Sequence, residues 1–327
     1  MPYSVFVTRH LTQEAEEKLD GFCQAEYWPE DTPPSYDVLL EKTPTVDGLV
    51  CLLTDRIDEN LINQAKNLKV ISQVAVGVDN IDLEAAAQAG IPVGHTPDLL
   101  TDATADLAFA LIMAAARRLG EAITYTAEGR WKTWELTTLL GADVHGATLG
   151  ILGMGRIGQA VAQRGLGFNM DIMYYNRSRV PEAETELGAE YVTLTELLQQ
   201  ADIVSLHVPL NDATRGMIGR DELALMKPNA ILVNTARGEV VDTEALVNAL
   251  NSGQIGYAAL DVTDPEPLPP DHELYQLPNA IITPHIGSAT RTARNNISLL
   301  AVENLIAGLE GRPLPAAAVQ PDQDNHD

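Results

Sequence analysis

The stretch that decides the fold is Thr148-Leu149-Gly150-Ile151-Leu152-Gly153-Met154-Gly155-Arg156-Ile157-Gly158. The apolar run 148–152 predicts a strand, and the residues that follow, 157–166, predict a helix. Between them the glycines have the spacing G-x-G-x-x-G. The first glycine allows a tight turn, the second lets the backbone approach a pyrophosphate, and the third lets helix and strand pack closely. The helix N-terminus offers N–H groups and a positive dipole to phosphates. The stretch therefore predicts a dinucleotide-binding turn, the alternative being a glycine-rich turn without a ligand.

The same alternation of strands and helices extends in both directions from this turn. Further strands are expected at Tyr3–Thr8, Gly48–Leu53, Val70–Val74, Asp171–Tyr175, Ile203–Val208, Ala230–Asn234, Ile255–Leu260 and Ala280–Thr283. Further helices are expected at Thr12–Asp20, Asp58–Gln64, Leu83–Ala89, Asp102–Leu119, Leu194–Gln200, Thr243–Asn251 and Thr290–Leu309. Strands separated by helices indicate βαβ units, so we expect two consecutive α/β modules with parallel sheets. The last helix could return to the first module, and the tail from Gly311 is expected to be loose.

Composition and charge exclude several classes of protein. The 327 residues are 45% hydrophobic and 20% charged, which favours a chain with a sizeable core over a disordered one. No apolar run is long enough for a membrane helix, and the first ten residues, MPYSVFVTRH, resemble no secretion signal. With only two cysteines, which form no metal-ligand spacing, we expect a cytoplasmic protein without a metal.

The net charge is −25, from 46 acidic and 21 basic side chains. This balance disfavours nucleic acid and anionic membranes as partners, because phosphate-rich partners need a basic surface. Two explanations of the acidic excess remain open: a cytoplasm of high salt, or an ordinary acidic protein.

The second strand of the glycine-rich module ends at Asn176-Arg177-Ser178-Arg179. A dinucleotide fold that binds NAD usually has an acid near this point, on the ribose hydroxyls. Here Asn176 stands in place of the acid. Two arginines with a serine between them follow at once, and they suit the additional phosphate of NADP. The alternative is that one arginine stacks on the adenine of either cofactor. We therefore expect NADP(H) to be preferred, with NAD(H) possible.

An arginine, a carboxylate and a histidine follow three later strands of the same module. Arg237 comes after AILVN, Glu266 after IGYAAL and His285 after AIIT. The carboxyl ends of parallel strands meet at one sheet edge, where open α/β sheets bind ligands. Arginine can hold a carboxylate or polarise a carbonyl, and histidine can exchange a hydroxyl proton near neutral pH. A carboxylate bonded to that histidine would fix its tautomer and favour its charged form. Together they suit hydride exchange on a 2-oxo acid, whereas singly each could be an ordinary surface charge or a turn residue.

Seven motifs carry a resemblance to a known family, the D-isomer-specific 2-hydroxyacid dehydrogenases, and within it most closely to glyoxylate/hydroxypyruvate reductases. The motifs are VGVDNID (76–82), TDATADLA (101–108), ILGMGRIGQAVA (151–162), SLHVPL (205–210), ILVNTARGEVVD (231–242), LDVTDPEP (260–267) and TPHIGSAT (283–290). The resemblance covers nearly the whole chain up to the tail. It implies two doubly wound, Rossmann/flavodoxin-like domains with the substrate in a cleft between them. Residues 1–99 and 290–327 would form the substrate-binding domain, and residues 100–289 the dinucleotide-binding domain.

The resemblance also implies roles for matching positions. Arg237 would bind the substrate, His285 would be the acid/base with Glu266 as its partner, and the N–H groups of Val76 and Gly77 would hold the substrate carboxylate. Asp261 would hold the nicotinamide amide near Ser288. The cofactor-binding residues expected in all are Thr104, Gly153, Met154, Gly155, Arg156, Ile157, Gly158, Asn176, Arg177, Ser178, His207, Pro209, Thr235, Ala236, Asp261 and Ser288.

We therefore predict NAD(P)H-dependent reduction of a small 2-oxo acid, glyoxylate or hydroxypyruvate first, to a 2-hydroxy acid. Related enzymes are homodimers, in which the segment around 101–146 forms an arm, and Trp134 would match a tryptophan that reaches the partner's active site. Two other readings remain. Phosphite or another 2-hydroxy acid could be the substrate, or the chain could be a non-enzymatic NAD(H)-sensing regulator.

Overall fold

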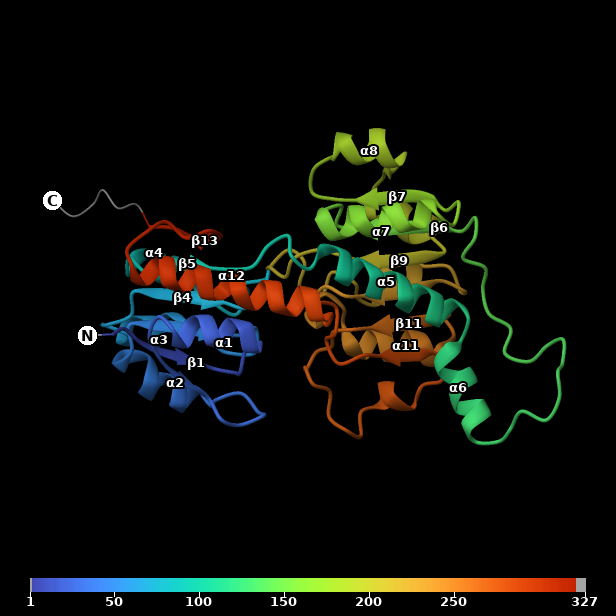
Figure 1. The fold of residues 1–327 in the computed structure, drawn as a ribbon. Helices are drawn as coiled ribbons and strands as arrows, with labels where there is room; N and C mark the ends of the chain where they lie inside the picture. Colours follow the sequence, from blue (N-terminus) through green and yellow to red (C-terminus); the bar gives the residue numbers. More distant parts are fainter. Residues whose placement is uncertain (1, 322–327) are drawn as a thin grey trace. The chain divides into compact units, whose positions relative to one another are not determined.

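The computed structural model describes residues 2–321, and the chain forms two compact units (Figure 1). Unit 1 comprises Met1–Leu100 and Ala289–Asp327, and unit 2 comprises Thr101–Ser288. In each unit helices cover both faces of a mainly parallel sheet. The α/β class with two doubly wound sheets is therefore confirmed. No helix among residues 2–321 has both the length and the apolar character needed to span a bilayer.

Unit 1 is built on a six-stranded sheet of order β13-β5-β4-β3-β1-β2. Its strands are β1 (Ser4–Val7), β2 (Gln24–Tyr27), β3 (Gly48–Cys51), β4 (Val70–Gln73), β5 (Val93–Gly94) and β13 (Ala317–Val319). Its helices are α1 (Gln13–Asp20), α2 (Tyr36–Lys42), the 3₁₀ turn Thr43–Thr45, α3 (Glu59–Gln64), α4 (Leu83–Gln88) and α12 (Arg291–Leu309). All pairs are parallel except β13 with β5.

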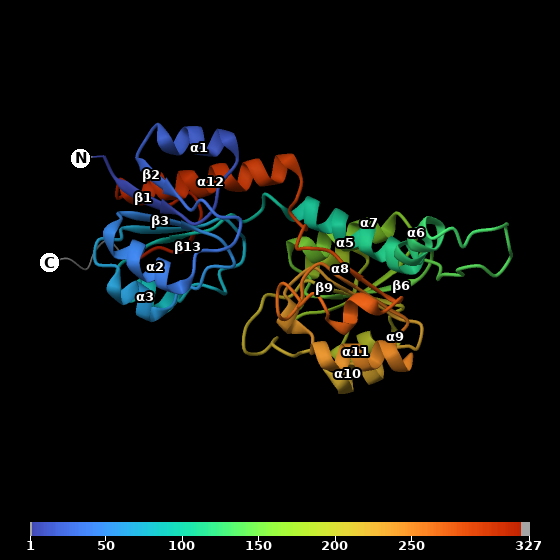
Figure 2. The ribbon, with the colours of Figure 1, turned by 90° about the horizontal axis from the view of Figure 1, so that it is seen from below.

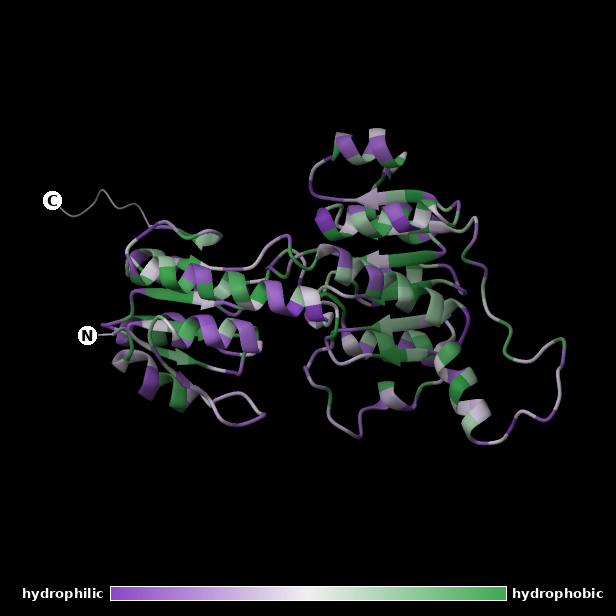
Figure 3. Cartoon of the chain, viewed as in Figure 1, coloured by the Kyte–Doolittle hydropathy of each residue, from purple (hydrophilic) through white to green (hydrophobic). Residues whose placement is uncertain are grey.

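Alternation along β1 divides the core of unit 1 between the two faces of the sheet. Val5 and Val7 pack on the side of α1 and α12, whereas Phe6 packs on the side of α2, α3 and α4. Figure 2 shows the two helical layers with the strands between them. Because both faces are covered, the strands are mostly apolar on both sides, as the colours of Figure 3 show.

The long helix α12 lies near the end of the chain and packs against the sheet of unit 1. The sequence alone does not determine whether this helix returns to the first α/β module. Ser72 on β4 donates to the carbonyl of Ala301 at 2.7 Å, and a Cβ on Gly308 would lie 2.5 Å from Val70. Asn304, which is fully buried, donates to the carbonyl of His95 and accepts from the N–H of Ala316, each at 2.9 Å. This one side chain therefore fixes α12 to the edge of the sheet.

The segment after α12 differs from the loose tail that was expected. Residues 317–319 form β13, which pairs antiparallel with β5. Pairing along an edge strand satisfies backbone groups there, so a short Ala/Val run is ordered in spite of its Pro/Ala-rich surroundings. The last part of the expected tail, residues 322–327, lies outside the described residues.

Unit 2 has a seven-stranded, wholly parallel sheet of order β12-β11-β10-β9-β6-β7-β8. Its strands are β6 (Thr148–Leu152), β7 (Asp171–Tyr175), β8 (Glu190–Tyr191), β9 (Ile203–Leu206), β10 (Ile231–Asn234), β11 (Tyr257–Leu260) and β12 (Ala280–Ile282). Its helices are α5 (Thr101–Ala116), α6 (Leu119–Ala127), α7 (Arg156–Leu166), α8 (Pro181–Leu187), α9 (Leu194–Gln200), α10 (Arg220–Leu225) and α11 (Thr243–Ser252), with 3₁₀ turns at Gly238–Val240 and Glu273–Gln276. α5, α7 and α8 cover one face, and α9, α10 and α11 the other (Figure 2).

The expected single helix 102–119 is wrong at its C-terminal end. α5 stops at Ala116, and Arg118 adopts a left-handed conformation with φ +50° before α6 begins. The carbonyl of Ala116 accepts from the N–H of Ala142 at 2.8 Å, which ties the end of α5 to the chain that returns from α6. The sequence does not reveal this helix end, because Arg118 is not a glycine and the apolar, alanine-rich pattern continues past it.

Replacement of Asn304 by alanine is expected to destabilise unit 1 by about 2–4 kcal/mol, because it removes a fully buried side chain and leaves two partly buried backbone groups without their partner. The melting temperature of the Asn304→Ala variant measures the loss. Asn248→Ala, which removes an exposed side chain on α11, is the matched control and is expected to change stability by less than about 0.5 kcal/mol. Equal melting temperatures for the two variants would contradict the role of Asn304.

Candidate active site

The turn between β6 and α7 has the shape that its glycines predict. Gly153 has φ +100°, and a Cβ there would lie 2.7 Å from the backbone of His207. A Cβ on Gly158 would lie 2.1 Å from the carbonyl oxygen of Gly153. Both positions therefore exclude a side chain, one through the turn and the other through close packing of helix on strand.

Gly155 differs from these two glycines, because a Cβ there would meet no atom within 4 Å. It is the N-cap of α7 and has no side chain that could accept from the first N–H groups of the helix. Because Gly155 caps the helix, the first N–H groups and the positive end of the helix dipole face this open position. The helix has 11 residues, which is long enough for its peptide dipoles to add up. The geometry fits the pyrophosphate of a dinucleotide, which needs close approach to backbone N–H groups.

The two arginines after β7 have different surroundings. Arg177 is exposed and makes no hydrogen bond or ion pair within residues 2–321. Arg179 forms two hydrogen bonds to Glu184, at 2.9 and 2.5 Å, and its guanidinium lies 5.5 Å from the ring centre of Tyr191. The pair suggested by the sequence is therefore split: Arg179 is bound to α8, and Arg177 extends into solvent.

The turn that carries Arg237 is held by a buried asparagine. Asn234, at the end of β10 and 1% exposed, donates to the carbonyl of Arg237 at 2.8 Å and accepts from the N–H of Ala236 at 3.0 Å. Between them, the buried hydroxyl of Thr235 has no hydrogen-bond partner in the described part of the chain. Buried polar atoms are rarely left unpaired, so this hydroxyl is free to bind a group from outside the chain.

The Arg237 turn also lies against the loop that carries Glu266. A Cβ on Gly238 would be 2.0 Å from the backbone of Thr263, so only glycine permits this approach. Glu266 in turn accepts from the N–H of Thr263 at 3.3 Å. Arg237 and Glu266 therefore come from loops whose backbones are in contact.

Glu266 and His285 form the central pair. The Oε1 atom of Glu266 lies 2.6 Å from Nδ1 of His285, and both side chains are partly exposed. Because Nδ1 faces a carboxylate, it carries the hydrogen of this bond, and Nε2 is left for another partner. The pair has the geometry of a general acid/base with its orienting carboxylate.

Asp261 determines the conformation of the loop that carries His285. Its carboxylate is 2% exposed and accepts from the hydroxyl of Thr283 at 2.5 Å and from the N–H groups of Ile286 and Gly287 at 2.9 and 2.7 Å. The N–H of His285 donates to the carbonyl of Asp261 at 2.9 Å. These bonds hold His285 in a left-handed conformation with φ +52°. The sequence had suggested Asp261 as a cofactor ligand and gave no signal of this second role.

His207 follows β9 beside the glycine-rich turn. Its Nε2 atom lies 2.8 Å from the hydroxyl of Ser205, and its N–H donates to the carbonyl of Leu152 at 2.7 Å. Burial lowers the pKa of His207 to about 3, so the side chain is neutral near pH 7. Pro209, two residues on, accepts from the hydroxyl of Thr214 at 2.6 Å.

Val76 and Gly77 belong to unit 1 and follow β4. Their N–H groups donate no hydrogen bond to any part of the chain that the structure describes. The carbonyl of Val76 accepts from Nδ1 of His95 at 3.0 Å, and that of Gly77 accepts from Nε2 of Gln73 at 3.2 Å. The turn therefore has two backbone donors that could bind an anion.

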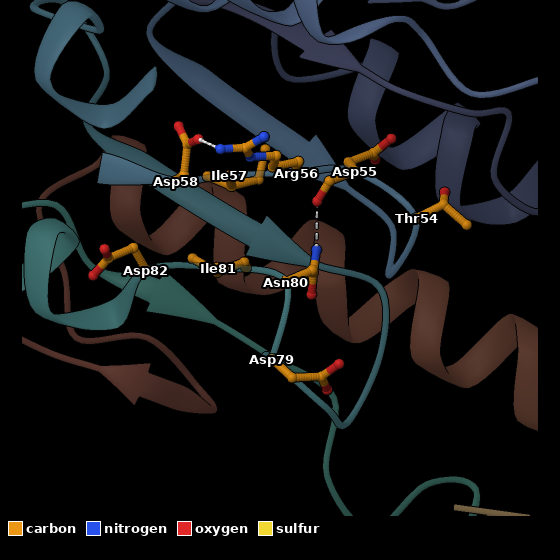
Figure 4. A pocket seen from close by; sticks show the side chains of 9 residues that line it. All are labelled: Thr54, Asp55, Arg56, Ile57, Asp58, Asp79, Asn80, Ile81 and Asp82. Carbon is orange, nitrogen blue, oxygen red and sulfur yellow. Dashed lines mark hydrogen bonds and ion pairs between the residues drawn. The ribbon is translucent and has the colours of Figure 1, made fainter. Parts of the chain in front are cut away.

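Unit 1 also contains a pocket of about 450 Å³ that includes none of the expected site residues (Figure 4). It is lined by Thr54, Asp55, Arg56, Ile57, Asp58, Asp79, Asn80, Ile81 and Asp82. The guanidinium of Arg56 lies 2.7 Å from Asp58, and Asn80 donates to the carbonyl of Asp55 at 2.8 Å. Four aspartates against one arginine disfavour an anionic ligand here. Within residues 2–321, no group of three or more His, Cys, Asp or Glu side chains could hold a metal ion.

Comparison with known protein families shows to which family the chain belongs. Residues 109–287 match the model of the D-isomer specific 2-hydroxyacid dehydrogenase, NAD binding domain. The chain belongs to the D-isomer-specific 2-hydroxyacid dehydrogenase family. The resemblance seen in the sequence motifs is thus confirmed, and the open position at Gly155 and the unpaired Thr235 hydroxyl lie in the part of the dehydrogenase that matches an NAD-binding model.

Relatives with curated names are similar over almost their whole length. A protein named glyoxylate reductase from Thermococcus litoralis is 50% identical over 319 residues, 96% of each chain. A protein with the same name from Aeropyrum pernix is 50% identical over 317 residues, 95% of this chain and 94% of that one.

Solved structures agree with the fold and include both forms of the cofactor. A crystal structure of a Thermus thermophilus protein has a TM-score of 0.91 and 50% identity, covering 97% of this chain and 100% of that one. An NADPH-dependent glyoxylate/hydroxypyruvate reductase from Sinorhizobium meliloti, solved with NADP and malonate, has a TM-score of 0.84 and 29% identity, covering 98% of each chain. A D-lactate dehydrogenase from Aquifex aeolicus, solved with NAD and lactic acid, has the same TM-score and identity, covering 98% and 100%. One of these two structural neighbours is thus solved with NADP and the other with NAD.

Proposed function

We propose that this dehydrogenase reduces small 2-oxo acids, glyoxylate and hydroxypyruvate foremost, to 2-hydroxy acids with NAD(P)H. The observation that carries the proposal is the 2.6 Å contact between Glu266 and His285 on the loops after β11 and β12, next to the Arg237 turn after β10. The names of the relatives support glyoxylate as the substrate class. The cytoplasmic location expected from the sequence stays a prediction.

Residues around the sheet edge of unit 2 suit a bound dinucleotide. The N–H groups at the start of α7 would hold its pyrophosphate, and the buried Thr235 hydroxyl would gain the partner that it lacks. The other residues that we propose for the cofactor are Thr104, Met154, Asn176, Arg177, Ser178, His207, Pro209, Ala236, Asp261 and Ser288. When bound, the reduced nicotinamide supplies a hydride to the carbonyl carbon of the substrate.

The protein's own groups supply the charge and the proton for this reaction. The guanidinium of Arg237 binds the substrate carboxylate and polarises the carbonyl, and the N–H groups of Val76 and Gly77 also hold the carboxylate. His285 enters as the imidazolium and gives its Nε2 proton to the carbonyl oxygen as that oxygen becomes a hydroxyl. Glu266 keeps the proton on Nδ1 throughout, so His285 ends as the neutral Nδ1–H tautomer and regains its proton from water.

The first test compares substrates. Oxidation of NADPH or NADH is followed with glyoxylate, hydroxypyruvate and pyruvate, and reduction of NADP or NAD with phosphite. We expect the highest kcat/KM with glyoxylate or hydroxypyruvate. Turnover with phosphite alone would replace the proposed substrate, and binding of cofactor without turnover of any of them would favour an NAD(H)-sensing regulator.

Replacement of His285 by alanine is expected to lower kcat by about 10²- to 10⁴-fold, because it removes the proton donor. The Kd for NADPH, measured by fluorescence, is expected to stay within about twofold. Glu266→Gln keeps an acceptor for Nδ1 but loses the negative charge, so we expect a smaller loss in kcat, about tenfold. Near-normal turnover by His285→Ala would remove the mechanism.

We infer that NADPH is preferred over NADH, because Arg177 is exposed and has no partner among residues 2–321, beside the expected ribose site and in a stretch without acids. An arginine–phosphate contact is worth about 1.5–3 kcal/mol, which is roughly ten- to a hundredfold in kcat/KM. Arg177→Ala is expected to lower kcat/KM for NADPH by that factor and to leave NADH nearly unchanged. Arg179→Ala, which breaks the contact with Glu184, is the matched control and should affect the two cofactors equally. A wild-type enzyme that is faster with NADH would contradict the preference.

We also infer a homodimer, from apolar side chains exposed on α6 and the segment that follows it. These are Leu119, Ile123, Trp131, Trp134, Leu136 and Leu140, and Leu136 is 78% exposed. So many large apolar side chains in one region are typical of a protein interface. Sedimentation is expected to give about twice the chain mass for the wild type and a monomer for Leu136→Asp. Tyr275→Asp, at another exposed apolar side chain, is the control that stays dimeric. A monomeric wild type would exclude the dimer.

A further inference from the structure

Three successive carbonyl groups after β4 are each bound by a different partner. The carbonyl of Ala75 accepts from the N–H of Thr96 at 2.9 Å, and that of Val76 from Nδ1 of His95 at 3.0 Å. The carbonyl of Gly77 accepts from Nε2 of Gln73 at 3.2 Å. The turn is therefore held through its acceptors, and within residues 2–321 the N–H groups of Val76 and Gly77 donate no hydrogen bond.

These contacts determine where the N–H groups point. The two cis peptide bonds in residues 2–321 both precede prolines elsewhere, so the peptides from Ala75 to Gly77 are trans. In a trans peptide the N–H points opposite to the C=O of the same plane. Hence the bond to the carbonyl of Ala75 directs the N–H of Val76, and the bond from His95 directs the N–H of Gly77.

His95 is well placed to act as a fixed clamp. It follows β5, and its own backbone is bound on both sides, by the carbonyl of Ala316 at 3.1 Å and by the side chain of Asn304 at 2.9 Å. A carbonyl oxygen can only accept, so Nδ1 of His95 carries the hydrogen in this contact. The hydrogen bond to Val76 thus needs only a donor at the Nδ1 position, and the other atoms of the imidazole ring take no part in it.

We propose that His95 is a positioning residue for substrate binding: by holding the carbonyl of Val76, it aims the N–H of Gly77 at the substrate carboxylate. The inference rests on the proposed function, in which Val76 and Gly77 bind that carboxylate. It adds a side chain that touches neither substrate nor cofactor and acts through one peptide group. A donor that is aimed in advance costs no reorganisation when the anion binds, so its loss weakens binding.

A pair of isosteric variants separates the donor from the ring. In asparagine the amide nitrogen can take the place of Nδ1, whereas in leucine a methyl group stands there. His95→Leu is expected to raise KM for glyoxylate about three- to tenfold, the value of one lost hydrogen bond, with kcat within about twofold. His95→Asn is expected to restore KM to within about twofold of the wild type. The Kd for NADPH should be the same in all three.

The control for loss of a histidine in the same unit is His10→Leu, since exposed His10 contacts Glu16 and not the turn. If His95→Leu is not folded, by melting temperature, His95→Ala replaces it in the same comparison. The inference is overturned if the donor-free variant leaves KM unchanged, or if His95→Asn raises KM as much as His95→Leu does. In both cases an active wild type would leave the proposed function intact. A wild type that reduces none of the 2-oxo acids would overturn the function and the inference together.

Discussion

The candidate site depends most on one buried carboxylate, that of Asp261. It accepts three hydrogen bonds from the loop of residues 283–287 and so imposes the left-handed conformation of His285. Only with that backbone in place does Nδ1 of His285 meet Glu266 at 2.6 Å. The buried side chain of Asn234 does the same for the Arg237 turn, through two hydrogen bonds to its backbone. In both cases a short polar side chain at the end of a strand binds the backbone of a loop. That loop in turn positions the side chain proposed to react, His285 or Arg237.

In unit 1 side chains also fix the backbone of a loop, but there they bind its carbonyl groups, whereas Asp261 in unit 2 binds N–H groups. There the carbonyl groups of the turn after β4 are bound by His95, Gln73 and a backbone N–H, whereas the N–H groups of Val76 and Gly77 donate no hydrogen bond within residues 2–321. In unit 2 the N-terminus of α7 offers N–H groups because Gly155 has no side chain to cap them. Backbone donors without a partner, which we propose as anion-binding positions, thus arise in two different ways: by hydrogen bonding of the acceptors of a turn, or by a helix N-terminus without a capping side chain.

The sequence predicted the helices, the strands and the candidate site residues better than it predicted the contacts that hold those residues in place. The glycine-rich turn and the parallel sheets could be predicted because apolar strands, glycine spacing and helix periodicity are local patterns. The same periodicity predicted the last helix, but its return to unit 1 depends on contacts across more than 200 residues and stayed open. The short strands β2, β5, β8 and β13 could not. β5 and β8 have only two residues each, β2 (QAEY) is not the continuous apolar run that marked the other strands, and β13 (AAV) lies in the Pro/Ala-rich tail. Arg237, Glu266 and His285 were placed at strand ends by the same local patterns. The splitting of Arg177 from Arg179 depends on Glu184, five residues further on, and the clamp by His95 depends on a contact across 19 residues, so neither leaves a signal in the sequence.

The net charge of −25 raises the question of how so acidic a protein could bind anionic ligands. Exposed charges are screened beyond about 8 Å at physiological ionic strength, so surface carboxylates farther away than this contribute little to the field at the site. The groups proposed to contact the carboxylate and the phosphates of the ligands are mostly backbone N–H groups and hydroxyls, which carry no net charge, together with Arg237 and Arg177. Such donors act at hydrogen-bond distance and need no basic surface around them. An acidic composition therefore argues against an extended polyanion, which needs many cations at once, and leaves room for a small anion that is held by a few donors with fixed directions.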